Sequence, residues 1–143
     1  MTHQIRALAQ QEPYRTHVQY LKTIPGISTF TSMVLLTEIV DINQFKNLDH
    51  LASYVGLVPC EDSSGEQKKS TGISRRRNAY LRVLLIESSW IAVRKDPALL
   101  MAFNKLIERM PKNRAIIQIA CKVLNRIRYV LKNHQPYEPC VVS

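Results

Sequence analysis

The sequence predicts a mainly α-helical protein, a helical bundle with one sharp hairpin between two helices. Apolar residues recur three and four positions apart in almost every periodic segment, which is the spacing of an amphipathic helix. Support for strands is thin, and the pattern allows at most a flexible basic loop or short β ribbon at about 60–73. With 143 residues, 45% of them apolar and 22% charged, the chain suits one globular domain rather than a disordered segment.

The first half of the chain predicts three helices. In order, the expected elements are a helix over about 4–22 with a break or kink at Pro13, a tight turn over 24–28, a helix over about 29–40, a connection over 41–47, and a short helix that stops at Gly56 and Pro59. Proline removes a backbone donor and disrupts a helix interior, which explains the expected break. Either Asn47 or Asp49 can cap the short helix. Phe45 is expected to enter the core from the connection.

The second half predicts three further helices and an extended tail. In order, these are a long helix that Ser74 or Asn78 opens and that ends near Lys95, a helix from Pro97 to before Pro111, a last helix capped by Asn113, and a tail over 134–143. Asp96 is a favourable N-cap residue, and Pro97 is favourable at the first position of the helix that follows. The apolar stripes expected to face the core are Leu81, Leu84, Leu85, Ser88 and Ile91 on the long helix, and Ile116, Ile119, Ala120, Val123, Leu124, Ile127, Val130 and Leu131 on the last helix.

The charge balance points to a polyanionic partner. The chain has 20 Lys and Arg against 11 Asp and Glu, a formal net charge of +9. Such a field attracts nucleic acid first and a membrane surface second. No apolar run approaches the roughly 18 residues of a membrane span, and no helix pairs a basic face with a bulky apolar one, so no membrane partner is expected. The polar N-terminal residues indicate a soluble protein inside the cell.

The segment LKTIPGISTFTSMVLL predicts a phosphate-binding turn. Gly26 can adopt a positive φ without steric cost, so the turn between the two helices can be very sharp. The backbone amides of Gly26, Ile27 and Ser28 then lead into a helix N-terminus, which favours an anion. This is the pattern of a helix-hairpin-helix element, which holds DNA phosphates without reading bases. A plain helical hairpin with a glycine turn is the alternative interpretation of the same residues.

A serine loop followed by basic residues is the second candidate site. Ser63 and Ser64 precede Gly65, and the cations that follow are Lys68, Lys69, Arg75, Arg76, Arg77 and Arg82. Hydroxyls beside so many cations indicate phosphate binding or attack on a phosphate backbone, whereas a solvated, flexible loop is the alternative. A serine hydroxyl needs an activating base or metal. The three cysteines and four histidines are scattered, so neither a metal site nor a cofactor is expected in this chain.

The order of these motifs resembles one known family. The segments that carry the resemblance are LKTIPGISTFTSMVLLTEIV, LASYVGLVP, SSG, TGISRRRNAYLRVLLIESS and HQPY. Together they are similar to the C-terminal domain of the insertion-sequence transposases related to the Piv invertase, also called DEDD or bridge-RNA-guided recombinases. The resemblance implies a remnant of a helical linker at 1–15, the transposase domain at 16–137 and a tail at 138–143. One departure is Arg77, which stands before Asn78 where the family usually has glycine.

The resemblance also implies roles and partners. Ser64 corresponds to the proposed nucleophile of the family, with Ser63 as the second choice, and it would form a covalent phosphoserine link with DNA. The activating Mg²⁺ is expected on a RuvC-like N-terminal domain that these residues do not match, so the chain alone should be inactive. The expected partners are DNA, a structured guide RNA and further copies of the full-length protein, in the bacterial cytoplasm near the nucleoid. The alternatives are a non-catalytic helix-hairpin-helix nucleic-acid-binding module and an oligomerisation module.

Overall fold

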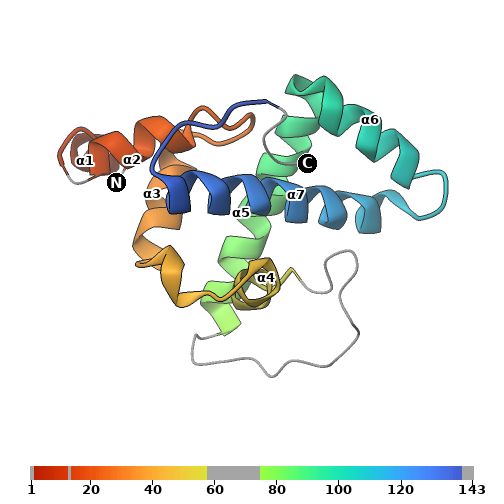
Figure 1. Ribbon diagram of the computed structural model, residues 1–143, viewed down its shortest axis with the longest axis horizontal. Helices are drawn as coiled ribbons and strands as arrows, with labels where there is room; N and C mark the ends of the chain where they lie inside the picture. The colour runs from red at the N-terminus through yellow and green to blue at the C-terminus, as the bar shows by residue number, and fades with distance from the viewer. Residues whose placement is uncertain (1, 13, 58–74, 140–143) are drawn as a thin grey trace.

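The computed structural model describes residues 2–12, 14–57 and 75–139, and every regular element within these ranges is a helix (Figure 1). The predicted mainly α class is therefore confirmed. The elements are α1 (Thr2–Ala9), α2 (Tyr14–Leu21), α3 (Thr29–Glu38), the 3₁₀ helix η1 (Ile42–Gln44), α4 (Leu48–Val55), α5 (Arg75–Lys95), α6 (Pro97–Leu106) and α7 (Lys112–Asn133). The ribbon expected at about 60–73 lies outside the described residues.

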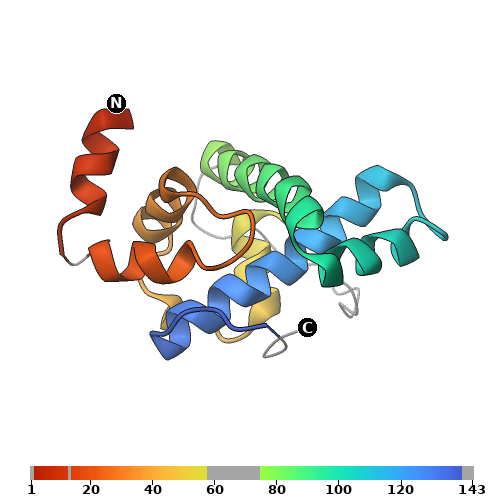
Figure 2. The same ribbon diagram turned by 90° about the horizontal axis from the view of Figure 1, so that it is seen from above.

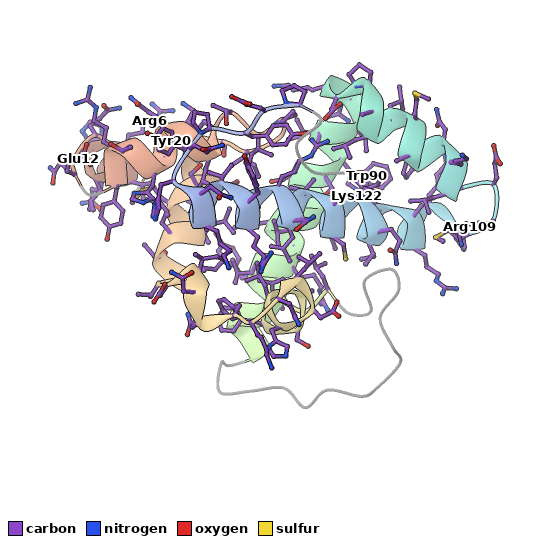
Figure 3. All side chains as sticks on the ribbon, in the orientation of Figure 1. Arg6, Glu12, Tyr20, Trp90, Arg109 and Lys122 are labelled. Atoms are coloured by element: carbon purple, nitrogen blue, oxygen red, sulfur yellow. The ribbon has the colours of Figure 1, made fainter. Side chains whose placement is uncertain are left out.

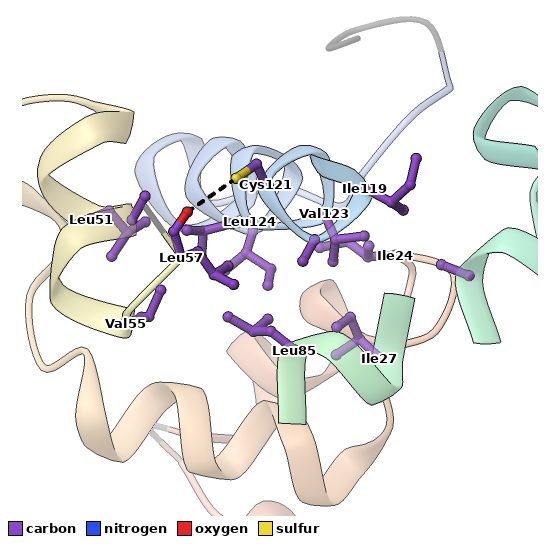
Figure 4. Packing of buried hydrophobic residues seen from close by; sticks show 14 of the residues in the cluster. Ile24, Ile27, Leu51, Val55, Leu57, Leu85, Ile119, Cys121, Val123 and Leu124 are labelled. Carbon is purple, nitrogen blue, oxygen red and sulfur yellow. Dashed lines mark hydrogen bonds between the residues drawn. The ribbon is translucent and has the colours of Figure 1, made fainter. Parts of the chain in front are cut away.

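Helix α7 is the centre of the molecule. It crosses the domain in front of α5, with α4 below this crossing and α6 to one side (Figure 1). All eight predicted apolar positions of α7 are buried, so its wide apolar face is confirmed. Leu85 from α5 and Leu51 from α4 pack toward the same face, where the Sγ of Cys121 lies 3.6 Å from the carbonyl oxygen of Leu57 (Figure 4). Burial on several sides explains why α7 is apolar over so wide an arc.

Side-chain caps mark the starts of α3, η1, α4 and α6. Asn47 rather than Asp49 caps α4, accepting the backbone N–H of His50 at 3.0 Å. Asp96 caps α6 as predicted, accepting the N–H of Ala98 at 2.9 Å. The predicted cap at Asn113 is wrong. Helix α7 already begins at Lys112, after Pro111 in an extended conformation, and no side chain caps it. Asn113 therefore lies inside the first turn, and the helix starts two residues earlier than predicted, directly after Pro111 with its fixed φ.

The inner face of α5 differs in part from the prediction. Leu81, Leu85 and Ser88 are buried as expected, and Leu84 is half-buried. Ile91, which was expected to face the core, is 37% exposed, and Ala92 takes the buried position. The turn between α2 and α3 packs directly on this end of α5, where it meets the backbone of Ser88 and the small Ala92. A small side chain is therefore required at position 92, where the turn contacts the helix.

The two ends of the chain pack against the bundle. The first predicted helix is broken as expected, and α1 and α2 hold a small cluster of Ala9 and Val18 against Met33 of α3. The C-terminal residues fold back along α7 (Figures 1 and 2). Tyr137 is buried there, and its backbone N–H donates to Oγ1 of Thr23 at 2.8 Å. The tail thus ties the last helix to the turn between α2 and α3.

Candidate nucleic-acid interface

The turn between α2 and α3 is held tightly against α5. Gly26 has φ +95°, a left-handed conformation that favours glycine. A Cβ added at Gly26 would overlap the carbonyl oxygen of Ser88 and lie 3.1 Å from the Cβ of Ala92. Ile24 and Ile27 on either side of the turn are buried in the main core (Figure 4). The sharp turn predicted from the sequence is therefore present, and its position is fixed by packing on both sides.

Of the three backbone N–H groups predicted to bind an anion, those of Gly26 and Ser28 are available at this turn. The N–H of Ile27 donates to the carbonyl oxygen of Ile24 at 3.1 Å, so it is used inside the turn. The hydroxyl of Ser28 caps α3 by accepting the N–H of Thr31 at 3.2 Å. Within the part of the chain that the structure describes, the N–H groups of Gly26 and Ser28 donate to no protein acceptor. These two groups lie beside the N-terminus of α3, where an anion is favoured.

A shallow pocket of about 230 Å³ opens at this turn. Its walls include the turn itself, Lys22 at the end of α2, Lys95 at the end of α5, and Ile91. Both lysines are exposed, and each is close enough to the turn to line the same pocket. The side chain of Ile91 is exposed because it forms part of the wall of this pocket. Sequence reasoning missed both lysines, although Lys22 stands only three residues before Pro25.

The other predicted site residues are placed only in part. Arg82 is exposed on α5. Nine residues separate it from Ile91, about 14 Å along a helix, so it belongs to a different part of the surface from the turn pocket. Arg75, Arg76 and Arg77 begin α5. Four predicted residues lie outside the described residues, namely Ser63, Ser64, Lys68 and Lys69.

The described residues also limit the chemistry of this surface. They contain no group of three or more His, Cys, Asp or Glu side chains that could hold a metal ion. None of the helices described is both long and apolar enough to cross a membrane. The surface is a cationic turn with free backbone donors, which suits phosphate oxygens.

Comparison with known proteins defines the class to which this chain belongs. A model of the transposase IS116/IS110/IS902 family matches residues 18–105. This match covers more than half of the chain and includes the Gly26 turn and both turn lysines. The chain therefore belongs to the IS116/IS110/IS902 transposase family.

Individual relatives agree with this assignment. The transposase for insertion sequence element IS1111A of Coxiella burnetii is 33% identical over 123 residues, which are 83% of this chain and 34% of that protein. A probable family 20 transposase of Pseudomonas aeruginosa is 29% identical over 126 residues, covering 85% of this chain and 37% of that protein. An IS110 insertion-element protein of Streptomyces coelicolor, described as an uncharacterized 43.6 kDa protein, is 28% identical over 94% of this chain and 33% of its own length. This chain thus spans about a third of the length of these relatives. No solved structure matches it.

Proposed function

We propose that this chain is the C-terminal, serine-bearing domain of a DNA transposase or site-specific recombinase related to the Piv invertase. Such an enzyme would cleave and rejoin DNA strands during transposition. The observation that carries the proposal is the family match over residues 18–105, which contains both the Gly26 turn and the serine loop. The net charge of +9 supports a nucleic-acid partner. The full-length protein would act in the bacterial cytoplasm as an oligomer, together with a structured guide RNA.

The Gly26 turn is the proposed contact with the DNA backbone, in the manner of a helix-hairpin-helix element. The free amides of Gly26 and Ser28 supply directed donors, and Lys22 and Lys95 supply charge at the same pocket. A phosphate at this position would interact with the N-terminus of α3 as well. Contacts of this kind fix the position of a duplex but carry no sequence information. Arg82 and the basic residues before it would bind a more distant part of the same nucleic acid.

Ser64 is the proposed nucleophile, with Ser63 as the alternative. Its Oγ would bond to a backbone phosphorus as the bond from that phosphorus to the leaving deoxyribose oxygen breaks, and the hydroxyl proton would pass to a base. A serine hydroxyl is weak without such activation, and the described residues do not provide a metal-binding set. As the family resemblance implies, we assign activation, and any Mg²⁺, to a RuvC-like domain outside these 143 residues. The chain alone is expected to bind DNA without cleaving it.

The test uses a full-length transposase that carries this domain and a DNA substrate on which a cleaved strand cannot be rejoined. The unmodified enzyme should become covalently attached to the DNA, and Ser64→Ala should abolish the attachment. Ser63→Ala is the matched control and should retain it. An adduct that survives in Ser64→Ala but disappears in Ser63→Ala would move the assignment to Ser63. An adduct that survives in both variants would refute serine attack.

Self-association is a second candidate function, and one face of α5 favours it. Tyr80, Val83, Trp90 and Ile91 are all exposed on this face although they are large and apolar. Figure 2 shows α7 along one side of α5 and no helix along the opposite side. Glu87 and Arg94 are exposed at positions that share this face. A second copy of this chain, running antiparallel, would place each glutamate near the partner's arginine. This face borders the Gly26 turn pocket, because Ile91 belongs to the face and also lines that pocket.

A further inference from the structure

A second pocket, of about 580 Å³, lies next to the turn pocket. It forms where five parts of the fold meet: the turn after α2, the end of α5, the first turns of α6, the middle of α7 and the C-terminal tail. Lys122 projects into this region from the middle of α7 (Figure 3). Pro25 and Lys95 line both pockets, so the two are neighbours on one surface. A pocket of this size is large enough for a small organic group.

The polar lining of this second pocket carries excess positive charge. Lys95, Lys122 and Arg126 line it, together with one carboxylate, Asp96. That carboxylate is already paired, because Oδ2 of Asp96 accepts from a terminal nitrogen of Arg126 at 2.7 Å. Neither lysine makes an ion pair within the residues that the structure describes. The pocket therefore suits an anionic ligand, and two cations remain to bind it.

Arg126 is the buried cation of this pocket. Its side chain is only 3% exposed, and its guanidinium carbon lies 4.6 Å from the centre of the Tyr137 ring. The Nε atom of Arg126 is buried and has no hydrogen-bond partner. A buried donor without an acceptor costs about 1–3 kcal/mol, so such groups are uncommon in folded proteins unless something else satisfies them.

Apart from Thr23 and Tyr137, the remaining walls are apolar, and this distinguishes the ligand from a bare phosphate. Pro97, Leu99, Ala102 and Pro139 line the pocket without offering side-chain donors. A phosphate ion would leave these walls unused, whereas a nucleotide carries a planar base that can pack against them. We propose that this pocket takes one unstacked nucleotide of a single strand. Its base lies against the apolar wall, and its phosphate lies toward Lys95 and Lys122.

This inference rests on the proposed DNA-binding function and makes it more specific. A strand whose phosphate is held at the Gly26 turn needs to pass only Pro25 to reach the second pocket, because that proline borders both. Unpaired nucleotides arise wherever DNA strands are opened for cleavage and exchange. The turn would then hold the backbone while the second pocket captures a base released from the stack.

The test compares two probes on the chain itself, a short fluorescent single-stranded oligonucleotide and the duplex of the same sequence. Ala102→Trp fills the pocket without changing its charge, and Lys122→Gln removes one cation without filling it. Ala102→Trp should weaken single-strand binding by roughly fivefold or more because the base loses its place in the pocket, and Lys122→Gln should weaken it similarly because one phosphate contact is lost. Duplex affinity should change less than about twofold, because both residues lie outside the turn pocket. Lys132→Gln is the matched control, an exposed lysine on the same helix that lines neither pocket, and it should bind both probes as the unmodified chain does.

Several outcomes separate the proposals. Unchanged single-strand affinity in a folded Ala102→Trp variant, or in Lys122→Gln if the first variant does not fold, would overturn the nucleotide pocket and leave duplex binding intact. Displacement of the oligonucleotide by inorganic phosphate as readily as by a mononucleotide would also overturn it, since the apolar wall would then contribute nothing. If the unmodified chain binds neither probe, the DNA-binding function itself fails.

Discussion

Gly26 and Ser88 meet so closely that a single methyl group at position 26 would overlap the carbonyl oxygen of residue 88. This contact joins the turn between α2 and α3 to the backbone of α5. It also explains why Ala92 is small, since a larger side chain there would push the turn away. The candidate phosphate site therefore depends on a glycine for its packing as well as for its backbone conformation.

We expect Gly26→Ala to destabilise the domain by about 2–5 kcal/mol. The left-handed backbone costs an alanine about 1–2 kcal/mol, and the overlap with Ser88 adds an overpacking cost of about 1–3 kcal/mol. Urea unfolding followed by circular dichroism measures the change. Gly56→Ala is the control, because Gly56 has a similar φ of +85° at the end of α4. Equal losses in the two variants would show that close packing on α5 contributes nothing.

The Asp96 side chain should contribute more to stability than an ordinary helix cap. One carboxylate oxygen caps α6, and the other binds the buried Arg126. Asp96→Ala removes both interactions and leaves a buried, unpaired cation, which costs about 3–5 kcal/mol. Asp96→Asn retains the cap and should lose less. Ser28→Ala removes only a cap, at α3, and should cost about 1 kcal/mol. Thermal unfolding should show the largest loss of stability in Asp96→Ala. A loss of stability in Asp96→Ala no greater than in Ser28→Ala would contradict the prediction.

The lysines at the turn pocket should govern duplex binding. Lys22→Gln removes one of the two cations beside the free amides of Gly26 and Ser28. If Lys22 neutralises one phosphate, this change should reduce the slope of log affinity against log salt by about one unit. Fluorescence anisotropy with a labelled duplex at several salt concentrations measures this slope. Lys112→Gln, at the exposed start of α7, is the control and should leave the slope unchanged. The same slope in both variants would place the phosphate contact elsewhere.

Much of the fold could be predicted because its signals are local. Helix periodicity identified the buried face of α7, and the Asp96–Pro97 pair located the start of α6. The predicted cap at Asn113 and the predicted burial of Ile91 were wrong because neither feature is set by a local pattern. Whether Asn113 or Pro111 immediately precedes the first helical residue of α7 depends on backbone geometry, which the sequence does not give. The exposure of Ile91 depends on a turn sixty-five residues earlier in the chain, which no local pattern records.

The candidate site was predictable only where its residues are contiguous. The Gly26 turn is one short segment, and its geometry agrees with the expectation from the sequence. Lys95 and Lys122 lie about 70 and 100 residues further along the chain, and only the packing of α5 and α7 brings them near Pro25. The roles of Ser63 and Ser64 stay predictions, since these residues lie outside the described part of the chain.

Self-association through α5 makes the most specific prediction about assembly. A two-fold axis between Trp90 and Ile91 brings residue 87 of each copy opposite residue 94 of the other, because an isologous interface repeats every contact. Glu87→Arg should therefore set two arginines against each other, and Arg94→Glu should do the same with two glutamates. Each variant alone should associate roughly fivefold or more weakly than the unmodified chain, which sedimentation velocity can measure.

The decisive measurement is a mixture of these two variants. In a mixed pair, the new arginine at 87 faces the new glutamate at 94, and the original Arg94 faces the original Glu87, so association should return. The double variant should also associate with itself. Because each copy carries a net charge of +9, added salt screens repulsion between copies and should not weaken the pair, whereas it weakens DNA binding. A mixture that associates no better than either variant alone would mean that this face of α5 does not pair with itself in the proposed register.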